Sequence, residues 1–472
     1  MIPELFNRNH KNPSTPGGIS VLSVWWAAVA SSPPLVTTAL AVIALTFAHS
    51  FFNAMAVAVG ADFQYTTFLC HPSDLFADLI KVASSYPGPI PSDLDQRTPW
   101  EVRYFSNNPY GGVVALEQGK LTHFHLPPLA TLLYLATRSA LNFVHAPAIV
   151  SVFTLAWLLP LATVPWFLTR KRMVSFLATT AILVSYPVLM AITRGNVSAG
   201  LTGTFVVIAM LLSYHGRSQR VIIMLLALAI NFRPNAALFL LLPLLGFPFV
   251  RAIRISVVAA ALAGCLFGLS LYVAQWIYPD YTIGSFLQGL GIYYHGYVLG
   301  NSGLNYGSSG FGLVKVILAA LEANFIGLES VNILISLWAM VILLLAVFLF
   351  LWNRLSGFVF AFLICSIYVL SGSTFSDYHL IVFWGTVMVY GTYSDTGKVI
   401  LTPLDLIVLC VSVFLLVPKH YIFLNGLSAQ VIINPYVLVI AVLSIFILVL
   451  GKAGVERHPS EPSAHTGSEQ TS

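Results

Sequence analysis

Residues 35–65 read LVTTALAVIALTFAHSFFNAMAVAVGADFQY, and this stretch decides the fold class of the chain. Residues 35–57 contain no Asp, Glu, Lys or Arg, and their length suits an α-helix that crosses a bilayer, which takes roughly 20 apolar residues. Asp62 follows a few residues later, where such a helix leaves the membrane. Only 8% of the 472 residues are charged, so an acid at that depth indicates a transport pathway or a reaction centre.

Long apolar runs of this kind recur along the whole chain. With 58% hydrophobic residues and a mean hydropathy of +0.85, the chain is more apolar than a soluble globular domain. We therefore expect an all-α polytopic membrane protein, because a β-barrel would show short alternating segments instead. The runs predict about twelve crossings, over residues 35–57, 147–169, 173–192, 197–214, 219–231, 236–249, 253–274, 330–351, 356–373, 380–393, 400–417 and 433–450.

Two stretches have more than one interpretation. Residues 219–249 form either two short crossings or one broken hairpin around Arg233-Pro234. Residues 126–145 are apolar but contain Arg138, Asn142 and His145, and we interpret them as a helix on the outer surface. With that choice the basic helix ends all face one side, which the positive-inside rule assigns to the cytoplasm. These ends carry Arg8, Lys11, Arg170, Lys171, Arg172, Arg217, Arg220, Arg251, Arg254, Arg354, Lys398, Lys452 and Arg457.

This topology divides the chain into three parts. Residues 1–34 form a cytoplasmic segment, residues 35–451 the transmembrane domain, and residues 452–472 a Ser-, Glu- and Pro-rich cytoplasmic tail that we expect to be disordered. Two long loops, at about 58–146 and 275–329, lie outside. Long loops with structure of their own are usually functional, so the first outer loop is expected to be structured and the outer face to be the working face.

The composition also bears on several classes of partner. The net charge of +5 comes from Lys and Arg at helix ends and not from a basic stripe, so nucleic acid is not an expected partner. The four cysteines are scattered and show neither a disulfide framework nor zinc spacing. His123-x-His125 alone is a weak metal signal, and no metal or cofactor is expected to be required.

The predicted topology brings isolated polar groups together at the outer ends of helices. Asp62 follows the first crossing, and three short segments follow or link later ones: Arg194-Gly195-Asn196, Arg233-Pro234-Asn235 and Ser376-Asp377-Tyr378-His379. A guanidinium group stays charged and binds phosphate oxygens in a fork. Arginines at the membrane surface therefore indicate a lipid phosphate as ligand, and Asp62 suits a proton acceptor for an incoming hydroxyl group.

These motifs resemble the GT-C superfamily of glycosyltransferases, which use polyprenyl-phosphate sugars, and within it glycosyltransferase family 87, the phosphatidylinositol-mannoside mannosyltransferases. The resemblance covers roughly residues 35–395. It rests on Asp62-x-x-Tyr65, Leu126-Pro127-Pro128-Leu129, Arg194-Gly195-Asn196, Arg233-Pro234, Asn305-Tyr306-Gly307-Ser308 and Ser376-Asp377-Tyr378-His379. The chain departs from the family pattern at Leu126, Arg233 and Tyr378, which leaves the sugar and the acceptor open.

The resemblance implies a GT-C helical bundle that transfers a sugar, such as mannose, with inversion from a polyprenyl-phosphate donor to a glycolipid or glycan acceptor. The expected location is the periplasmic face of a bacterial inner membrane, among membrane lipids. Asp62 is the expected base and His379 a second catalytic residue, with Arg194, Arg233 and Asn196 on the donor phosphate. Further substrate-binding candidates are Tyr65, Arg103, His125, Arg138, Asn305, Ser308 and Asp377.

Two rival functions fit the same composition. A proton-coupled secondary transporter would use Asp62 or Asp377 as its coupling site, but it would favour acids near the bilayer midplane and often inverted repeats. No strong internal repeat is visible in the sequence. A non-catalytic lipid flippase or scaffold would tolerate Asp62→Asn.

Overall fold

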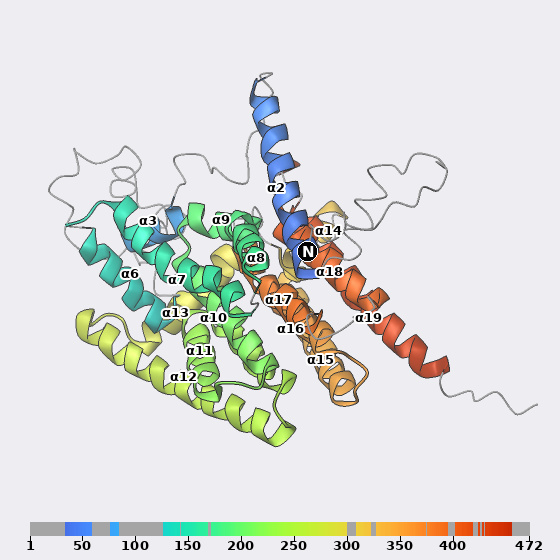
Figure 1. Ribbon diagram of the computed structural model, residues 1–472. Coiled ribbons are helices and arrows are strands. Elements are labelled where there is room, and N and C mark those ends of the chain that lie inside the picture. The colour runs from blue at the N-terminus through green and yellow to red at the C-terminus, as the bar shows by residue number, and fades with distance from the viewer. Residues whose placement is uncertain are drawn as a thin grey trace, which may run out of the picture.

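The computed structural model describes residues 34–58, 76–84, 126–168, 171–299, 308–321, 327–394, 402–418, 423–424, 427–428 and 430–455, apart from the single residues 142 and 374. Nearly all of this part of the chain is helical (Figure 1). The exception is a two-residue antiparallel pair, β1 (Phe423–Leu424) with β2 (Leu427–Ser428), in which Phe423 faces Ser428.

The helices occur in the following order along the chain. The first half contains α2 (Pro34–Ala58), α3 (Ala77–Ser84), α6 (Pro128–Ala140), α7 (Ala146–Leu168), α8 (Arg172–Val184), α9 (Tyr186–Arg194), α10 (Val197–Tyr214), α11 (Gln219–Phe232), the 3₁₀ helix η5 (Pro234–Leu245) and α12 (Phe249–Ile277). The second half contains α13 (Ile283–Tyr293), the π-helical turn η6 (Tyr294–Val298), α14 (Gly310–Ala320), α15 (Leu328–Leu351), α16 (Gly357–Ser371), the 3₁₀ helix η8 (Asp377–Val382), α17 (Phe383–Ser394), α18 (Pro403–Leu416) and α19 (Gln430–Val455).

The structure supports a multi-pass membrane protein. Six helices of the described part are long and apolar enough to cross a bilayer by themselves, namely α2, α7, α10, α12, α15 and α19. The pair α8–α9 makes a seventh span if it is counted as one helix bent by 49°. Five shorter apolar helices, α11, η5, α14, α16 and α18, fall below the length of an ordinary span. The expected number of about twelve crossings therefore stays a prediction.

The observed helices differ from the expected spans in several places. Residues 173–192 were expected to form one helix, but α8 ends before Ser185 and α9 begins with Tyr186-Pro187, because Pro187 cannot donate a backbone hydrogen bond. Residues 219–249 were expected as two short crossings or as one broken hairpin around Arg233-Pro234, and they form α11 and η5, which meet at Arg233. Two helices are longer than expected. The predicted span 253–274 lies within the longer α12, and α19 continues to Val455, past the predicted boundary at residue 451.

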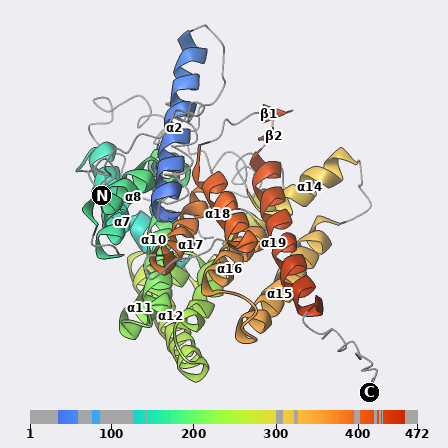
Figure 2. The same ribbon diagram turned by 45° about the vertical axis from the view of Figure 1, so that its right-hand side comes forward.

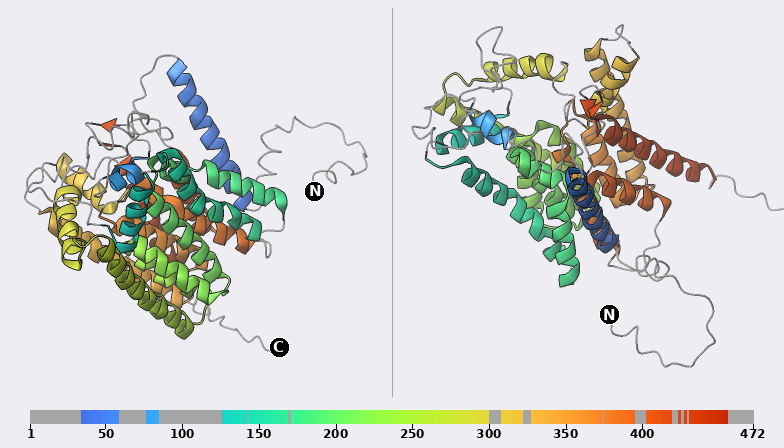
Figure 3. Two further views of the ribbon diagram at one scale, coloured as in Figure 1. Left: turned by 90° about the vertical axis from the view of Figure 1, so that its left-hand side faces the viewer. Right: turned by 90° about the horizontal axis from the view of Figure 1, so that it is seen from above.

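Two groups of helices meet along α17. Figure 2 shows α7, α8, α10, α11 and α12 on one side and α15, α16, α18 and α19 on the other, and the view from above in Figure 3 shows the same division. The centre is formed by α10, which packs against α7, α11, η5, η8 and α17, and by α16, whose residues from Phe358 to Leu370 are all buried. By contrast, α12 and α15 expose most of their apolar surface, as lipid-facing helices do.

Small residues let α10 lie close to its neighbours. A Cβ atom at Gly200 would lie 2.5 Å from the ring of Trp157 on α7, and one at Gly203 would lie 2.8 Å from Cγ2 of Ile381 in η8. The Thr204 hydroxyl donates a hydrogen bond to the Trp157 carbonyl (3.0 Å). Close approach at small residues with interhelical hydrogen bonds is how membrane helices associate without a strong hydrophobic drive between them.

Basic residues gather at one end of the bundle. There Arg251 donates hydrogen bonds from Nε and Nη2 to Gln219 Oε1 (3.2 and 3.1 Å), Gly246 lies against the Ser213 carbonyl, and Gly357 lies against the Tyr214 ring. These contacts bring together the segments that carry Arg217, Arg220, Arg251, Arg254 and Arg354. The turn between α9 and α10 and the turn between α11 and η5 lie at the opposite ends of their helices.

We expect Gly200→Ala to destabilise the protein by about 1–3 kcal/mol, because the added methyl group overpacks a fully buried tryptophan. The matched control is Gly264→Ala on exposed α12, where a Cβ meets nothing within 4 Å. That change is expected to be neutral or slightly stabilising, since Ala favours helices over Gly. Thermal unfolding in detergent measures both. Equal melting temperatures for the two variants would contradict this packing.

Candidate functional site

The turn Arg194-Gly195-Asn196 joins α9 to α10, and its geometry explains why glycine and asparagine occupy the second and third positions. Gly195 follows the end of α9 with φ +64°, a left-handed conformation that glycine adopts without strain. A Cβ atom there would lie 3.2 Å from the Cα atom of Phe76, so glycine also lets the segment before α3 approach. Asn196 caps α10, because its Oδ1 accepts the Ala199 N–H (3.0 Å).

Asp78 at the start of α3 binds this turn from the other side. Arg194 donates from Nη2 (2.7 Å) and from Nε (3.2 Å) to Asp78 Oδ1, and Asn196 donates from Nδ2 to Asp78 Oδ2 (2.9 Å). The side chains of the ion pair are only 20% and 14% exposed. Arg194, a predicted phosphate ligand, is therefore already paired with a carboxylate and holds α3 on the bundle.

Arg233 differs from Arg194 because it has no acidic partner in the described part of the chain. It lies half-buried between α11 and η5, and its shortest polar contact runs from Nη2 to Asn196 Oδ1 at 3.4 Å. Its Nε atom is buried and makes no hydrogen bond. A buried guanidinium normally has its donors satisfied, so Arg233 has capacity for a further anionic or polar acceptor.

Neutral aromatic and imidazole groups surround Arg233. The guanidinium charge acts on Tyr134 of α6, Tyr368 of α16, and Tyr378 and His379 of η8. The His379 ring is buried and lies 4.3 Å from the Phe375 ring. Burial raises the pKa of the Tyr134 phenol, an effect that nearby Arg233 partly offsets, so this phenol stays neutral at neutral pH. The Asp78–Arg194 ion pair also acts on Tyr134 and Tyr378, so the site combines this ion pair with a second guanidinium, that of Arg233, among neutral hydrogen-bonding groups.

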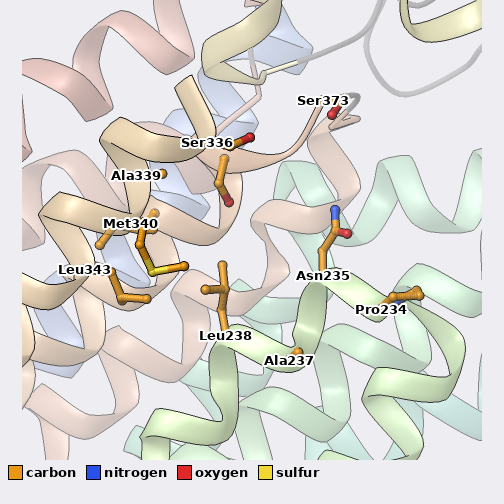
Figure 4. A pocket seen from close by; sticks show the side chains of 11 residues that line it. Pro234, Asn235, Ala237, Leu238, Ser336, Ala339, Met340, Leu343 and Ser373 are labelled. Carbon is orange, nitrogen blue, oxygen red and sulfur yellow. The ribbon is translucent and has the colours of Figure 1, made fainter. Parts of the chain in front are cut away.

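An apolar groove is lined by Pro234 and Asn235, which directly follow Arg233 in the chain. It has a volume of about 390 Å³ and runs between η5, α15 and α16. Figure 4 shows Asn235, Ser336 and Ser373 toward one end and Leu238, Met340 and Leu343 farther along. Ser373 Oγ donates to Oδ1 of Asn332, one helical turn before Ser336 on α15 (3.2 Å). The groove therefore changes from polar to apolar along its length.

Asp377 lies in a separate buried cluster. It is 0% exposed, and it accepts hydrogen bonds from the Tyr186 hydroxyl (2.5 Å), the Ser308 hydroxyl and Asn434 Nδ2 (3.3 Å). Tyr186 belongs to α9, Ser308 precedes α14, and Asn434 belongs to α19. Two substrate-binding candidates, Asp377 and Ser308, thus belong to one hydrogen-bonded cluster that joins distant segments of the chain to η8.

The remaining predicted residues are placed as follows. Arg138 is buried in α6, whereas Asp62, Tyr65, Arg103, His125 and Asn305 lie outside the described residues. Within the described part, no three His, Cys, Asp or Glu side chains come together as a metal site. Asp405 forms a capping box with Thr402 at the start of α18.

Sequence reasoning missed two members of the site as candidates. Asp78 was only one of several acids in the first outer loop, and nothing in its neighbours marked it as the partner of Arg194. Tyr134 lies in the apolar stretch 126–145, and its position beside Arg233 depends on how α6 packs against α11 and α12. Contacts between segments that are far apart in the chain leave no pattern in the local sequence that would predict them.

Comparison with family models, with curated proteins and with solved structures finds no match to this chain. The resemblance to the GT-C superfamily therefore rests on the short motifs. Of these, the structure brings Arg194-Gly195-Asn196, Arg233-Pro234 and Tyr378-His379 to one site.

A double-mutant cycle tests the pairing of Asp78 with Arg194. We expect Asp78→Asn and Arg194→Gln each to lower stability, with a coupling energy of about 1–3 kcal/mol, because either single change removes the charge partner of a partly buried ionised group. The control is the exposed pair His295 and Glu329, 3.7 Å apart, for which solvent screening predicts little coupling. Denaturant or thermal unfolding gives the energies. Additive effects of Asp78→Asn and Arg194→Gln would contradict the ion pair.

Proposed function

We propose that this protein is an inverting glycosyltransferase that takes a sugar from a polyprenyl-phosphate donor and transfers it to a glycolipid or glycan acceptor. The observation that carries the proposal is Arg233, a half-buried guanidinium without an acidic partner among the described residues and with an unsatisfied Nε. The two residues that follow it, Pro234 and Asn235, line an apolar groove that has polar groups at one end. A polyprenyl phosphate has a negatively charged group that can bind the Arg233 guanidinium and an apolar chain that can lie in the groove.

In this proposal Arg233 binds the donor phosphate. A phosphate oxygen would accept hydrogen bonds from the guanidinium in the fork geometry that arginine favours. Tyr134 stays neutral there and can donate a hydrogen bond without adding negative charge. Arg194, already neutralised by Asp78, positions the turn and Asn196, whose Oδ1 lies near Arg233. This refines the expectation that both arginines bind phosphate directly.

The reaction needs a proton acceptor but no proton donor. The acceptor hydroxyl oxygen forms a bond to the anomeric carbon while the bond from that carbon to the phosphate oxygen breaks. The hydroxyl proton passes to a carboxylate, which we propose is Asp62, and the electron pair leaves with the phosphate. Attack opposite the leaving group inverts the anomeric configuration. Arg233 stabilises the charge that develops on the phosphate as the sugar departs, the kind of contribution that fixed charges make to catalysis.

The groove is proposed to hold the isoprenoid chain. Its apolar part is formed by residues of η5, α15 and α16, including Leu238, Met340 and Leu343, and its polar part lies next to Pro234. A lipid-linked donor arranged along it has its chain among apolar side chains and its phosphate at Arg233. Each buried methylene contributes about 0.8 kcal/mol, so the chain would supply much of the donor affinity.

The orientation follows from the charges at the two ends of the bundle. The end with Arg217, Arg220, Arg251 and Arg354 is proposed to face the cytoplasm by the positive-inside rule. Arg233 then lies toward the outer face, which is the periplasmic face in a bacterial inner membrane. About twelve crossings belong to this proposal, with the shorter apolar helices completing the bundle.

A proton-coupled carrier is the alternative, and the buried Asp377 favours it. An acid that is fully buried among membrane helices is a common proton site in transporters. The same contacts to Tyr186, Ser308 and Asn434 also suit a structural clasp. The glycosyltransferase and the carrier predict different effects of Asp377→Asn on sugar transfer and on solute uptake.

Sugar transfer by the purified protein in nanodiscs tests the proposal, with radiolabelled polyprenyl-phosphate sugars as donors and total membrane lipid as acceptor. We expect Arg233→Gln to lower the rate about 10²–10³-fold, as loss of one oxyanion-stabilising group does. Arg233→Lys keeps the charge and should retain part of the rate. Arg251→Gln, at the opposite end of the bundle, is the control and should act like wild type. Equal transfer by Arg233→Gln and wild type would overturn the role of Arg233.

Two further variants separate the functions in the same assay. Asp62→Asn should abolish transfer while donor binding persists, because the base is lost. Asp377→Asn should lower the melting temperature but leave the transfer rate of the folded fraction nearly unchanged. Absence of transfer from every donor by folded wild type, together with solute uptake that Asp377→Asn abolishes, would establish the carrier instead.

A bulky residue in the groove tests where the chain lies. We expect Ala339→Phe to raise KM about tenfold for a long-chain donor, because it displaces about two methylene groups. KM for a short-chain donor should change little. Leu337→Phe on the same helix faces outward, where Leu337 is 58% exposed, and serves as the control. An equal rise in KM for both donors would contradict this position of the chain.

A further inference from the structure

A second cavity lies at the basic end of the bundle, between α7 and α10. Its volume is about 510 Å³, within the roughly 300–1,000 Å³ of small-ligand pockets. Nearly all of its lining is apolar or carries a hydroxyl group, and two residues after the end of α10 supply the charge and the imidazole. The lining consists of Pro160, Thr163, Val164, Phe167, Leu168, Ile208, Leu211, Leu212, His215 and Arg217.

The packing of α7 on α10 explains why a cavity forms here. The two helices are in close contact at Trp157 and Gly200, and the Thr204 hydroxyl bonds to the Trp157 carbonyl (3.0 Å). No glycine of α10 follows Gly203, so larger side chains hold the helices apart toward their ends. The Thr163 hydroxyl in the lining donates a hydrogen bond to the Pro160 carbonyl of its own helix (2.9 Å). The interior of the cavity is therefore apolar.

The mouth of the cavity is cationic and reaches the lipid-facing surface. Arg217 is exposed and forms no salt bridge with an acid of the described residues. Burial, together with the charge of Arg217, lowers the pKa of His215, so its imidazole is neutral at pH 7 and can donate a hydrogen bond. Phe167 at the rim is 87% exposed, which opens the apolar interior toward the hydrocarbon of a surrounding membrane.

The charges around the mouth are complementary to an anion. None of the lining residues is acidic. Arg172 begins α8 just after α7 ends, and Arg220 lies in the first turn of α11.

We propose that this cavity is a binding site for an anionic phospholipid of the leaflet at the basic end. One acyl chain enters beside Phe167 and lies between α7 and α10, and the lipid phosphate accepts hydrogen bonds from Arg217 and His215. Basic pockets between helices on the cytoplasmic side bind acidic lipids in this way. The site does not depend on the proposed enzymatic function, because it lies at the other end of α10 from Arg233 and Asn196.

Thermal unfolding of the purified full-length protein in detergent tests this site. The probes are dioleoyl phosphatidylglycerol, dioleoyl phosphatidylcholine and inorganic phosphate, each added at equal concentration. We expect the anionic lipid to raise Tm by about 2–4 °C, as specific ligands do, and the neutral lipid and phosphate to raise it little. Arg217→Gln should abolish the shift. Arg220→Gln, an exposed arginine outside the lining, should keep it.

These outcomes distinguish a specific binding site for an anionic lipid from nonspecific electrostatic attraction to the basic end of the bundle. Equal shifts for Arg217→Gln and Arg220→Gln would overturn the proposal, and so would an equal effect of both lipids or a full shift from phosphate alone. Ile208→Trp, which fills the cavity without changing charge, should also abolish the shift. Native mass spectrometry gives a second readout. It should show retained phosphatidylglycerol on wild type and on Arg220→Gln but not on Arg217→Gln, and retention by Arg217→Gln would also overturn the proposal.

Discussion

The side-chain amide of Asn196 is the contact on which the proposed site depends. Its oxygen caps α10 through the Ala199 N–H (3.0 Å) and lies 3.4 Å from Nη2 of Arg233, and its nitrogen donates to Asp78 (2.9 Å). One side chain thus fixes the start of the central helix, the position of α3 and the surroundings of Arg233. The left-handed Gly195 before it makes this geometry accessible. Any change in this turn would act on all three elements at once.

The structure distinguishes two arginines that look alike in the sequence. Both follow apolar helices and precede a turn, yet Arg194 is held by Asp78 whereas Arg233 is among tyrosines and a histidine. A paired guanidinium contributes mainly to architecture, while one with an unsatisfied donor can bind a ligand. This difference is the reason we propose that the site binds a single phosphate group, with the attached chain in the groove along η5, α15 and α16.

Much of the fold could be predicted, because long uncharged runs require membrane helices and their approximate bounds follow from the polar residues between them. The segments Arg194-Gly195-Asn196 and Arg233-Pro234 could also be placed at one site, since crossings that alternate in direction bring every second turn to the same side. The partner of Arg194 could not, because Asp78 is 116 residues away in the chain. The break at Ser185 follows from Pro187, whose effect on helix geometry periodicity alone does not show.

The most direct test of the account is a cryo-electron microscopy structure of the protein in nanodiscs, enlarged with a bound antibody fragment and saturated with a polyprenyl phosphate that carries no sugar. The account predicts density for the phosphate within hydrogen-bonding distance of the Arg233 guanidinium and density for the chain between η5 and α15. A lipid phosphate bound elsewhere, with Arg233 engaged by a carboxylate of the protein itself, would contradict it.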